Sequence, residues 1–195
     1  ADLSGLTGGL SAAMAGVPQR RHDPGRTLAQ LVLALADGAT CLSDLAAFRS
    51  QPTMFGPVPS EATVWRTFDR VGPVELRGIA TARAAARERA WAAGAGPATG
   101  EMVIDIDSTI ITTKADKQDA AATYKRTYGH HPLLAICPDT DEVLAGILRP
   151  GNAGANTAAD HIVVLADALD QLPSLWRAGH APGDDPALAH RRILV

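Results

Sequence analysis

Cysteine, lysine and aromatic residues are scarce in this chain of 195 residues. The two cysteines, Cys41 and Cys137, form no CxxC pair, which excludes a disulfide framework and a cysteine zinc site. We expect both to pack as small apolar side chains in a reducing cytoplasm. The longest apolar runs, 28–36 and 162–169, are interrupted by polar residues and fall well short of the roughly 18 apolar positions that a membrane span needs. A transmembrane role is therefore excluded, and we expect no export signal, because the first residues show no basic segment followed by an apolar one.

Charge is unevenly distributed although the formal net charge is only −3. Residues 1–93 contain ten arginines and eight acids, whereas residues 94–195 contain eight lysines and arginines and thirteen acids. This asymmetry does not by itself identify a nucleic-acid surface, because solvated helical faces produce similar counts. A hydrophobic content of 46% is sufficient for one ordinary folded domain or two small ones.

Apolar spacing in the first ninety residues predicts helices. Leu28, Leu31, Val32 and Leu35 follow the i, i+3, i+4, i+7 pattern of one buried helical face, which ends at Asp37. Helical spacing with other apolar residues also predicts core positions for the three tryptophans, Trp65, Trp91 and Trp176.

Two further short helices are expected at 43–49 and 60–71, on either side of a proline-rich connector. Together they broadly resemble a helix-turn-helix, whose later helix would offer Arg66 and Arg70 to DNA. The connector is longer than the usual turn. A plain helical bundle with solvated arginines is the equally weighted alternative.

The pattern changes from helices to strands after the Gly/Pro-rich segment 94–100. We place a domain boundary there, with a helical N-terminal domain at 1–98 and a mixed-sheet α/β domain at 99–195. Strands are predicted at 102–107, 133–137, 143–148 and 191–195, the second and third forming a hairpin.

One helix is expected between the third and fourth of these strands. Thr157 and Asp160 resemble a capping box at its start. One buried face is predicted to contain Ala158, Ile162, Leu165, Leu169 and Leu172. We expect Asp160, Asp167 and Asp170 to be solvated charges, and His130 and His131 to be hydrogen-bonded structural residues.

Two acids, Asp105 and Asp107, interrupt the apolar strand 102–107. Residues i and i+2 of a strand point to the same face about 6.6 Å apart, so both carboxylates can converge on one divalent cation or one reacting group. The structural alternative is an edge strand, or an aspartate that caps the turn through Ser108.

A strand that ends in D-x-D-x-T resembles the first motif of the haloacid-dehalogenase-like phosphatases. That resemblance would make Asp105 the nucleophile and Asp107 the general acid. Those enzymes also need a later acidic pair after a second apolar strand, and Asp184 and Asp185 follow no such strand. The phosphatase interpretation therefore depends on one motif.

A second resemblance extends over nearly the whole chain. Residues 144–161 form a long and specific segment that is similar to the catalytic domain of IS1380-type (IS4-like) bacterial insertion-sequence DDE transposases. Further similar segments lie at 21–26, 37–45, 55–60, 63–66, 103–109 and 129–135.

This resemblance implies an RNase H-like catalytic core that holds two divalent metals, Mg²⁺ or Mn²⁺, and acts on DNA. The implied partners are the terminal inverted repeats and target DNA, with self-association on DNA and a cytoplasmic, nucleoid-associated location. The D-x-T context favours Asp107 as the metal ligand, with Asp105 as the alternative or a supporting neighbour.

The family's second acid would follow the last predicted strand, and the third would lie further on. We therefore expect residues 99–195 to be the first half of the catalytic domain, with an incomplete metal site. The chain is accordingly expected to be an inactive fragment, of poor solubility or prone to oligomerise. A DNA-binding fragment without catalysis is a further alternative.

Overall fold

A computed structural model of the chain describes residues 1–18, 21–114, 117–154, 157–180 and 183–195. These residues divide into two compact units, Ala1–Arg89 and Ala90–Val195, which we call the N-terminal and C-terminal units. Within the described ranges, no helix has the length and apolar content required to cross a bilayer.

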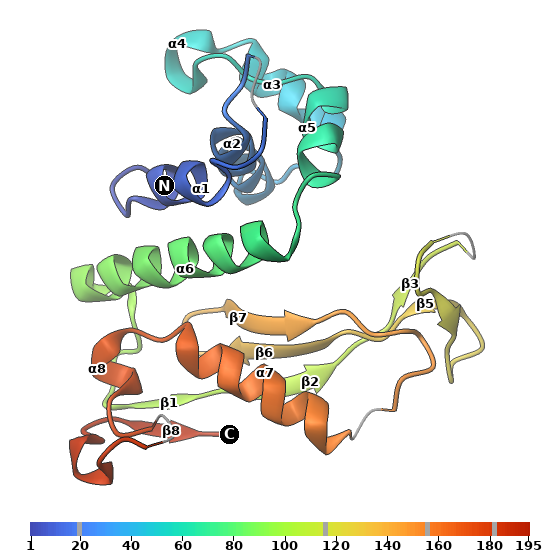
Figure 1. The fold of residues 1–195 in the computed structure, drawn as a ribbon. Helices are drawn as coiled ribbons and strands as arrows, with labels where there is room; N and C mark the ends of the chain where they lie inside the picture. The colour runs from blue at the N-terminus through green and yellow to red at the C-terminus, as the bar shows by residue number, and fades with distance from the viewer. Residues whose placement is uncertain (19–20, 115–116, 155–156, 181–182) are drawn as a thin grey trace. The chain divides into compact units, whose positions relative to one another are not determined.

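The N-terminal unit is built from helices alone in its described part (Figure 1). A short 3₁₀ turn at Leu42–Asp44 leads into α3. The α-helices are α1 (Leu6–Ala13), α2 (Pro24–Ala36), α3 (Leu45–Arg49), α4 (Pro52–Phe55), α5 (Glu61–Phe68) and α6 (Pro73–Ala90).

Helix α2 ends where the sequence predicts, with Asp37 as its C-cap, but it buries a different face. The Asp23 carboxylate accepts a hydrogen bond from the Arg26 N–H at 2.8 Å and so caps its first turn. Leu28 is buried, whereas Val32 and Leu35 are exposed. The buried positions also include the small or polar residues Thr27, Ala29, Gln30 and Ala34. The predicted face was wrong because apolar residues surround this helix, so spacing alone does not select the packed side.

Trp65 is not a core residue, in contrast to the prediction. Its side chain is 65% exposed, while Val64 and Thr67 of the same helix are buried. The other two tryptophans, Trp91 and Trp176, are buried and meet edge to face with ring centroids 6.0 Å apart. The core prediction is therefore confirmed for two of the three.

The two cysteines also differ. Cys137 is buried as predicted, but Cys41 is exposed. Cys41 lies beside Asp44, whose carboxylate accepts hydrogen bonds from the backbone N–H groups of Thr40 and Cys41 at 2.8 and 3.0 Å. These bonds, led by that from Thr40, lower the pKa of Asp44 because they stabilise its ionised form.

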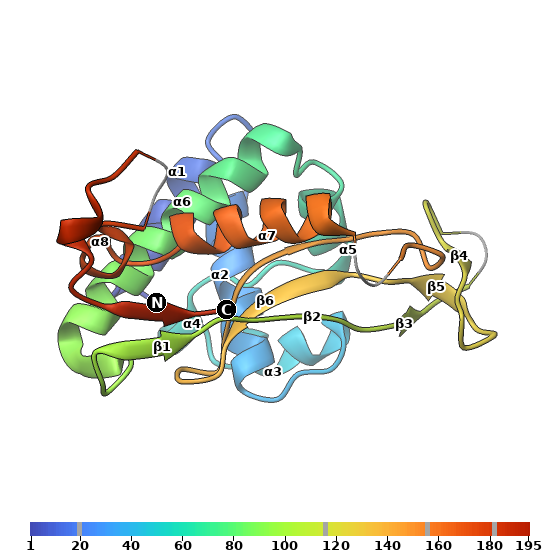
Figure 2. The same cartoon turned by 90° about the horizontal axis from the view of Figure 1, so that it is seen from below.

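The described part of the C-terminal unit contains three small sheets. Strand β1 (Glu101–Val103) pairs in parallel with β8 (Arg192–Leu194), as Figure 2 shows. Strand β2 (Asp105–Ser108) pairs antiparallel with β6 (Leu133–Cys137), which pairs antiparallel with β7 (Glu142–Ile147). The third sheet has the order β3 (Ile111–Thr112), β5 (Tyr128–His130) and β4 (Ala121–Ala122). The hairpin and the strands predicted at 133–137, 143–148 and 191–195 are confirmed within one or two residues. The strand predicted at 102–107 is divided at Ile104 into β1 and β2, which belong to separate sheets, and the third sheet was not predicted.

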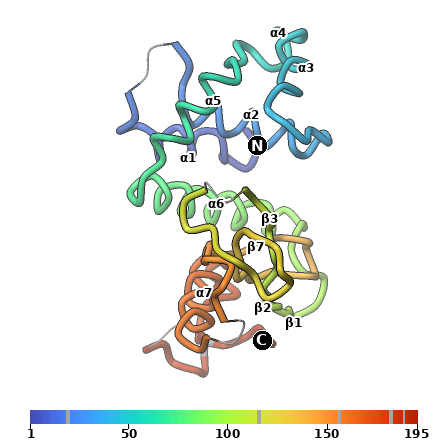
Figure 3. The backbone as a smooth tube through the Cα atoms, turned by 90° about the vertical axis from the view of Figure 1, so that its right-hand side faces the viewer, coloured from blue at the N-terminus to red at the C-terminus, as the bar shows by residue number. Residues whose placement is uncertain are grey.

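Helix α7 (Ala158–Asp170) packs across β7, β6 and β2 (Figure 3). Val164 and Ala168 of this helix are fully buried against Ile104, Ala135 and Leu144 of the strands' apolar core. Ile162, predicted to be buried, is 68% exposed. The unit also contains a π-helical turn, Trp91–Ala95, a short helix, α8 (Ser174–Arg177), and a 3₁₀ turn, Pro186–Leu188.

Close packing of α1 against α2 leaves no room for a side chain at Gly25. A Cβ atom there would lie 2.2 Å from backbone atoms of Leu10 and Ser11. We expect Gly25→Ala to lower the free energy of unfolding by about 1–3 kcal/mol, since the helix backbones must separate. Urea unfolding followed by circular dichroism measures the change.

Gly8→Ala is the matched control, because a Cβ atom at Gly8 of α1 would meet nothing within 4 Å. The free energy of unfolding of this variant should rise by about 0.5–1 kcal/mol, because alanine lowers the entropy of the unfolded state. Equal effects of the two substitutions would contradict the packing argument.

Candidate functional site

Asp105 and Asp107 lie on the exposed face of β2. Both are exposed, whereas Ile106 between them packs against the core of the C-terminal unit. In the register with β6, Asp105 lies opposite Ile136, and Asp107 lies opposite Leu134. Since α7 packs on the face that contains Ile106, the two carboxylates are on the face of the strand opposite this helix.

The carboxylate of Asp107 is oriented by its own turn. Its Oδ1 accepts a hydrogen bond from the Ser108 N–H at 2.7 Å. In the described part of the chain, no three His, Cys, Asp or Glu side chains gather as a metal-binding group. The structure thus brings two carboxylates together on one strand face, and a site for two metals needs additional oxygen ligands.

Residues from other elements lie beside the end of β2. The Thr109 N–H donates to the carbonyl of Pro132 at 3.2 Å, which places the turn after Asp107 next to His131. His131 is buried, and its Nδ1 lies 2.9 Å from the carbonyl oxygen of Ala153. His130 likewise has Nε2 2.9 Å from the carbonyl of Gln118. Both histidines are structural, as the sequence predicts.

Arg149 is a buried cation that the sequence interpretation left without a role. Its Nε donates to the His131 carbonyl at 3.0 Å, and its Nη1 donates to the Gly154 carbonyl and to Asp160 Oδ2, each at 3.0 Å. It thereby connects the end of β7, the following loop and the first turn of α7. A buried cation needs such partners because unpaired charge is costly in an apolar interior.

Asp160 therefore acts as the partner of Arg149 and not as a solvated charge. The predicted capping box is also wrong, because Thr157 makes no side-chain hydrogen bond to the helix and instead donates to Gly154. The sequence contains an indication of this ion pair, since an arginine and an acid flank a Gly- and Asn-rich loop. Ala155 and Asn156 of that segment lie outside the described residues.

The acidic pair Asp184 and Asp185 serves local structure. Asp184 accepts a hydrogen bond from the Gly179 N–H at 3.0 Å, and Asp185 accepts one from the Ala187 N–H at 2.9 Å at the start of a 3₁₀ turn. Neither residue follows a strand. The second acidic motif that the phosphatase interpretation requires is therefore not formed by this pair.

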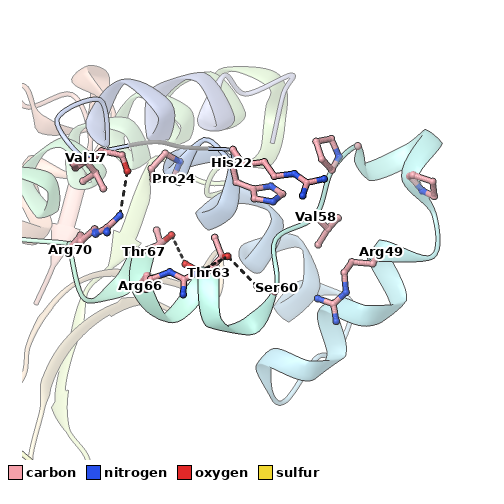
Figure 4. A pocket seen from close by; sticks show the side chains of 15 residues that line it. Val17, His22, Pro24, Arg49, Val58, Ser60, Thr63, Arg66, Thr67 and Arg70 are labelled. Carbon is pink, nitrogen blue, oxygen red and sulfur yellow. Dashed lines mark hydrogen bonds between the residues drawn. The ribbon is translucent and has the colours of Figure 1, made fainter.

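Arg66 and Arg70 line a cavity in the N-terminal unit with a volume of about 990 Å³. Their spacing of four residues places them on the same side of α5 and its extension. Figure 4 shows them with His22 and Arg49 around this cavity. Arg21 also lines it, and among the described lining residues there is no Asp or Glu.

Comparison with known protein families decides between the interpretations. The family model for the transposase DDE domain, group 1, matches residues 3–182. The chain belongs to this DDE transposase family. No curated protein and no solved structure matches the chain.

The matched range of this DDE transposase includes both units. It contains the carboxylates of β2, the cations of the cavity and the Arg149–Asp160 pair. The predicted transposase identity is thus confirmed at the level of the DDE family, and a role related to transposition follows from it.

The Arg149–Asp160 pair should be important for the stability of the transposase C-terminal unit. Arg149→Met removes the donor to Asp160 and to two carbonyl groups. We expect a loss of about 2–4 kcal/mol in the free energy of unfolding. Fluorescence of the buried Trp91 and Trp176 during urea unfolding reports on this unit.

Arg177→Met provides the control. Arg177 Nη1 lies 4.0 Å from Asp170 Oδ1, and the two side chains are 45% and 77% exposed. Loss of such a surface pair should cost less than about 1 kcal/mol. If both variants unfold at the same urea concentration, the buried pair contributes no more to stability than the surface pair does.

Proposed function

We propose that this DDE transposase chain takes part in metal-dependent DNA cleavage and strand transfer at the ends of an IS1380-type insertion sequence. The observation that carries this proposal is the pair Asp105 and Asp107 on one exposed strand face within the family match. The following Ser108 and Thr109 give Asp107 the D-x-T context expected for the first acid.

The strand arrangement supports an RNase H-like catalytic core for residues 99–195. Strands β2, β6 and β7 form an antiparallel sheet, with β3, β4 and β5 between β2 and β6 in the chain; α7 follows, and β8 then pairs in parallel with β1. This order is compatible with the first half of an RNase H-like domain. Residues 1–98 would form the helical, DNA-binding domain.

The carboxylates of β2 fit Mg²⁺ or Mn²⁺. Both metals prefer oxygen ligands, and Asp107 and Asp105 offer carboxylate oxygens that are accessible on one face. When bound, such metals activate the attacking oxygen and stabilise the leaving oxygen of a phosphodiester. Asp107 would hold metal directly, and Asp105 would be a second ligand or a supporting neighbour.

The chain itself contributes orientation at this site. The Ser108 N–H holds one oxygen of Asp107, and this bond fixes the carboxylate on the face away from the apolar core. The bond from Thr109 to Pro132 fixes the turn that follows. Both contacts restrict the motion of the ligand before any metal arrives.

DNA is the proposed partner of both units. Arg66 and Arg70 would contact it from the N-terminal unit, with the terminal inverted repeats and target DNA as the bound sequences. Self-association on DNA would bring two element ends together. The cellular location would be the bacterial cytoplasm, associated with the nucleoid.

Asp107→Asn in the full-length transposase tests the catalytic assignment. We expect Mg²⁺- or Mn²⁺-dependent cleavage of a duplex with the terminal inverted repeat to fall at least about 100-fold, because a neutral amide binds metal poorly. Gel analysis of end-labelled duplex measures the rate.

Asp167→Asn is the matched control, since Asp167 is an exposed acid on α7. It should retain cleavage close to that of the unmodified transposase. Full activity of Asp107→Asn would reject Asp107 as a metal ligand. Loss of activity in both variants would show that the assay reports only on overall charge.

Residues 1–195 by themselves should perform no strand transfer. The described residues supply only two carboxylates on the β2 face, and DDE chemistry uses a third acid. Incubation with Mn²⁺ and a pre-cleaved element end measures joining to plasmid DNA. Joined products would contradict the proposal that this chain is inactive by itself.

The same preparation distinguishes the phosphatase alternative. A complete phosphatase site built on Asp105 and Asp107 should turn over p-nitrophenyl phosphate, and we expect no turnover. Hydrolysis that disappears in Asp105→Asn would favour the phosphatase instead.

A further inference from the structure

The cavity of the N-terminal unit concentrates positive charge without neutralising it. Four arginines line it: Arg21, Arg49, Arg66 and Arg70. None of the four forms an ion pair with an acid among the described residues. Four like charges around one concavity repel one another in the free protein, and a polyanion would relieve that repulsion.

Three of these guanidinium groups are held in place by neutral acceptors. Arg49 Nη1 donates to the Pro59 carbonyl at 3.0 Å, and Arg70 Nη1 donates to the Pro18 carbonyl at 3.3 Å. Arg66 Nη2 donates to Thr63 Oγ1 at 3.1 Å. A guanidinium has five N–H donors, so one such bond positions the group and leaves most of its hydrogen-bonding capacity.

The wall of the cavity is anchored from within the unit. Gln30 is buried, and its Nε2 donates to the carbonyls of Phe55 and Pro57 at 2.9 and 3.3 Å. This ties α2 to the segment in which Gly56, Pro57 and Val58 line the cavity. Preformed sites of this kind lose little entropy when a ligand binds.

Hydroxyl groups complete the lining on the α5 side. Ser60 and Thr63 place their hydroxyl oxygens 3.1 Å apart, and both residues line the cavity beside Arg66 (Figure 4). Arginine, serine and threonine side chains are among the common donors to phosphate oxygens in protein–DNA interfaces.

The concave shape favours phosphates over base edges as the contacted groups. A helix that reads bases must enter the major groove with its reading residues protruding. Arg66 and Arg70 instead face a cavity, whereas the outer side of α5 exposes Trp65. The charge of this helix is therefore directed at a ligand that enters the concavity.

We propose that this cavity binds the sugar-phosphate backbone of DNA, with Arg21 and Arg49 joining Arg66 and Arg70 in a sequence-independent contact. The proposal rests on the proposed function, because it takes DNA as the partner. It adds two arginines and assigns α5 to backbone contact and not to base reading.

Fluorescence anisotropy with residues 1–195 tests this at several KCl concentrations between 50 and 200 mM. The probes are a labelled duplex of the terminal inverted repeat and a scrambled duplex of equal composition. Arg49→Ala and Arg66→Ala should each weaken binding about 3- to 10-fold, by the same factor on both duplexes. Each should also reduce the slope of log K against log salt by about 1.

Two controls accompany these variants. Arg77→Ala removes an exposed arginine of α6 outside the cavity lining and should change neither affinity nor slope. Arg49→Lys keeps the charge and should retain the unmodified salt slope. Circular dichroism of every variant identifies any loss of folding.

Each outcome has a distinct meaning. If Arg49→Ala and Arg66→Ala behave as Arg77→Ala, the cavity is not the contact surface. If Arg66→Ala weakens only the inverted-repeat duplex, α5 reads bases and the backbone assignment is wrong. Micromolar binding of pyrophosphate without binding of either duplex identifies a small phosphate ligand and overturns the proposal. If the unmodified chain binds neither duplex nor pyrophosphate, DNA binding as part of the proposed function fails with it.

Discussion

The C-terminal unit depends on one constraint, the alternation of core-facing and outward-facing side chains along the segment 101–108. Met102, Ile104 and Ile106 are buried or partly buried in the core that includes α7, so the residues between them must point the other way. Asp105 and Asp107 are among those residues. Burial of the apolar face therefore places both carboxylates on the accessible face, without any force acting on the acids themselves.

The N-terminal unit is organised by a different principle, the close approach of small residues. Gly25 contacts the backbone of α1, and Gly9 and Gly78 meet Ala82 and Ala13. Such contacts let the helix backbones approach closely, and larger apolar side chains such as Leu10, Met14 and Leu28 fill the core beside them. Elsewhere in the same unit, four arginines from separate segments converge on one cavity.

Much of the fold could be predicted from the sequence, and the failures share one cause. Strand β2, the β6–β7 hairpin and the helix starting after Thr157 follow from period-two and period-3.6 patterns within single segments. The packed faces of α2 and α5 did not follow, because they depend on which neighbour each helix meets. Trp65 is exposed for this reason, although its local spacing matches a buried stripe.

The candidate site shows the same difference between residues found from a pattern within one segment and residues brought together by tertiary contacts. Asp105 and Asp107 could be identified from one strand, whereas the pairing of Arg149 with Asp160 joins residues across a loop. The gathering of Arg21 and Arg49 around Arg66 and Arg70 brings together segments far apart in the chain. Residues joined only by tertiary contact leave no periodic trace in the sequence, so only the three-dimensional arrangement reveals them.

The pairing of β1 with β8 has a consequence for the order of folding. Glu101 and Arg192 lie 91 positions apart, yet they meet across this parallel pair. During synthesis, β1 leaves the ribosome long before its partner exists, while the β6–β7 hairpin can close early through local contacts. Strand β2, which bears the two carboxylates, can therefore pair with β6 before β8 covers the edge of β1. For that interval the open edge of β1 exposes the nascent chain to pairing with other strands.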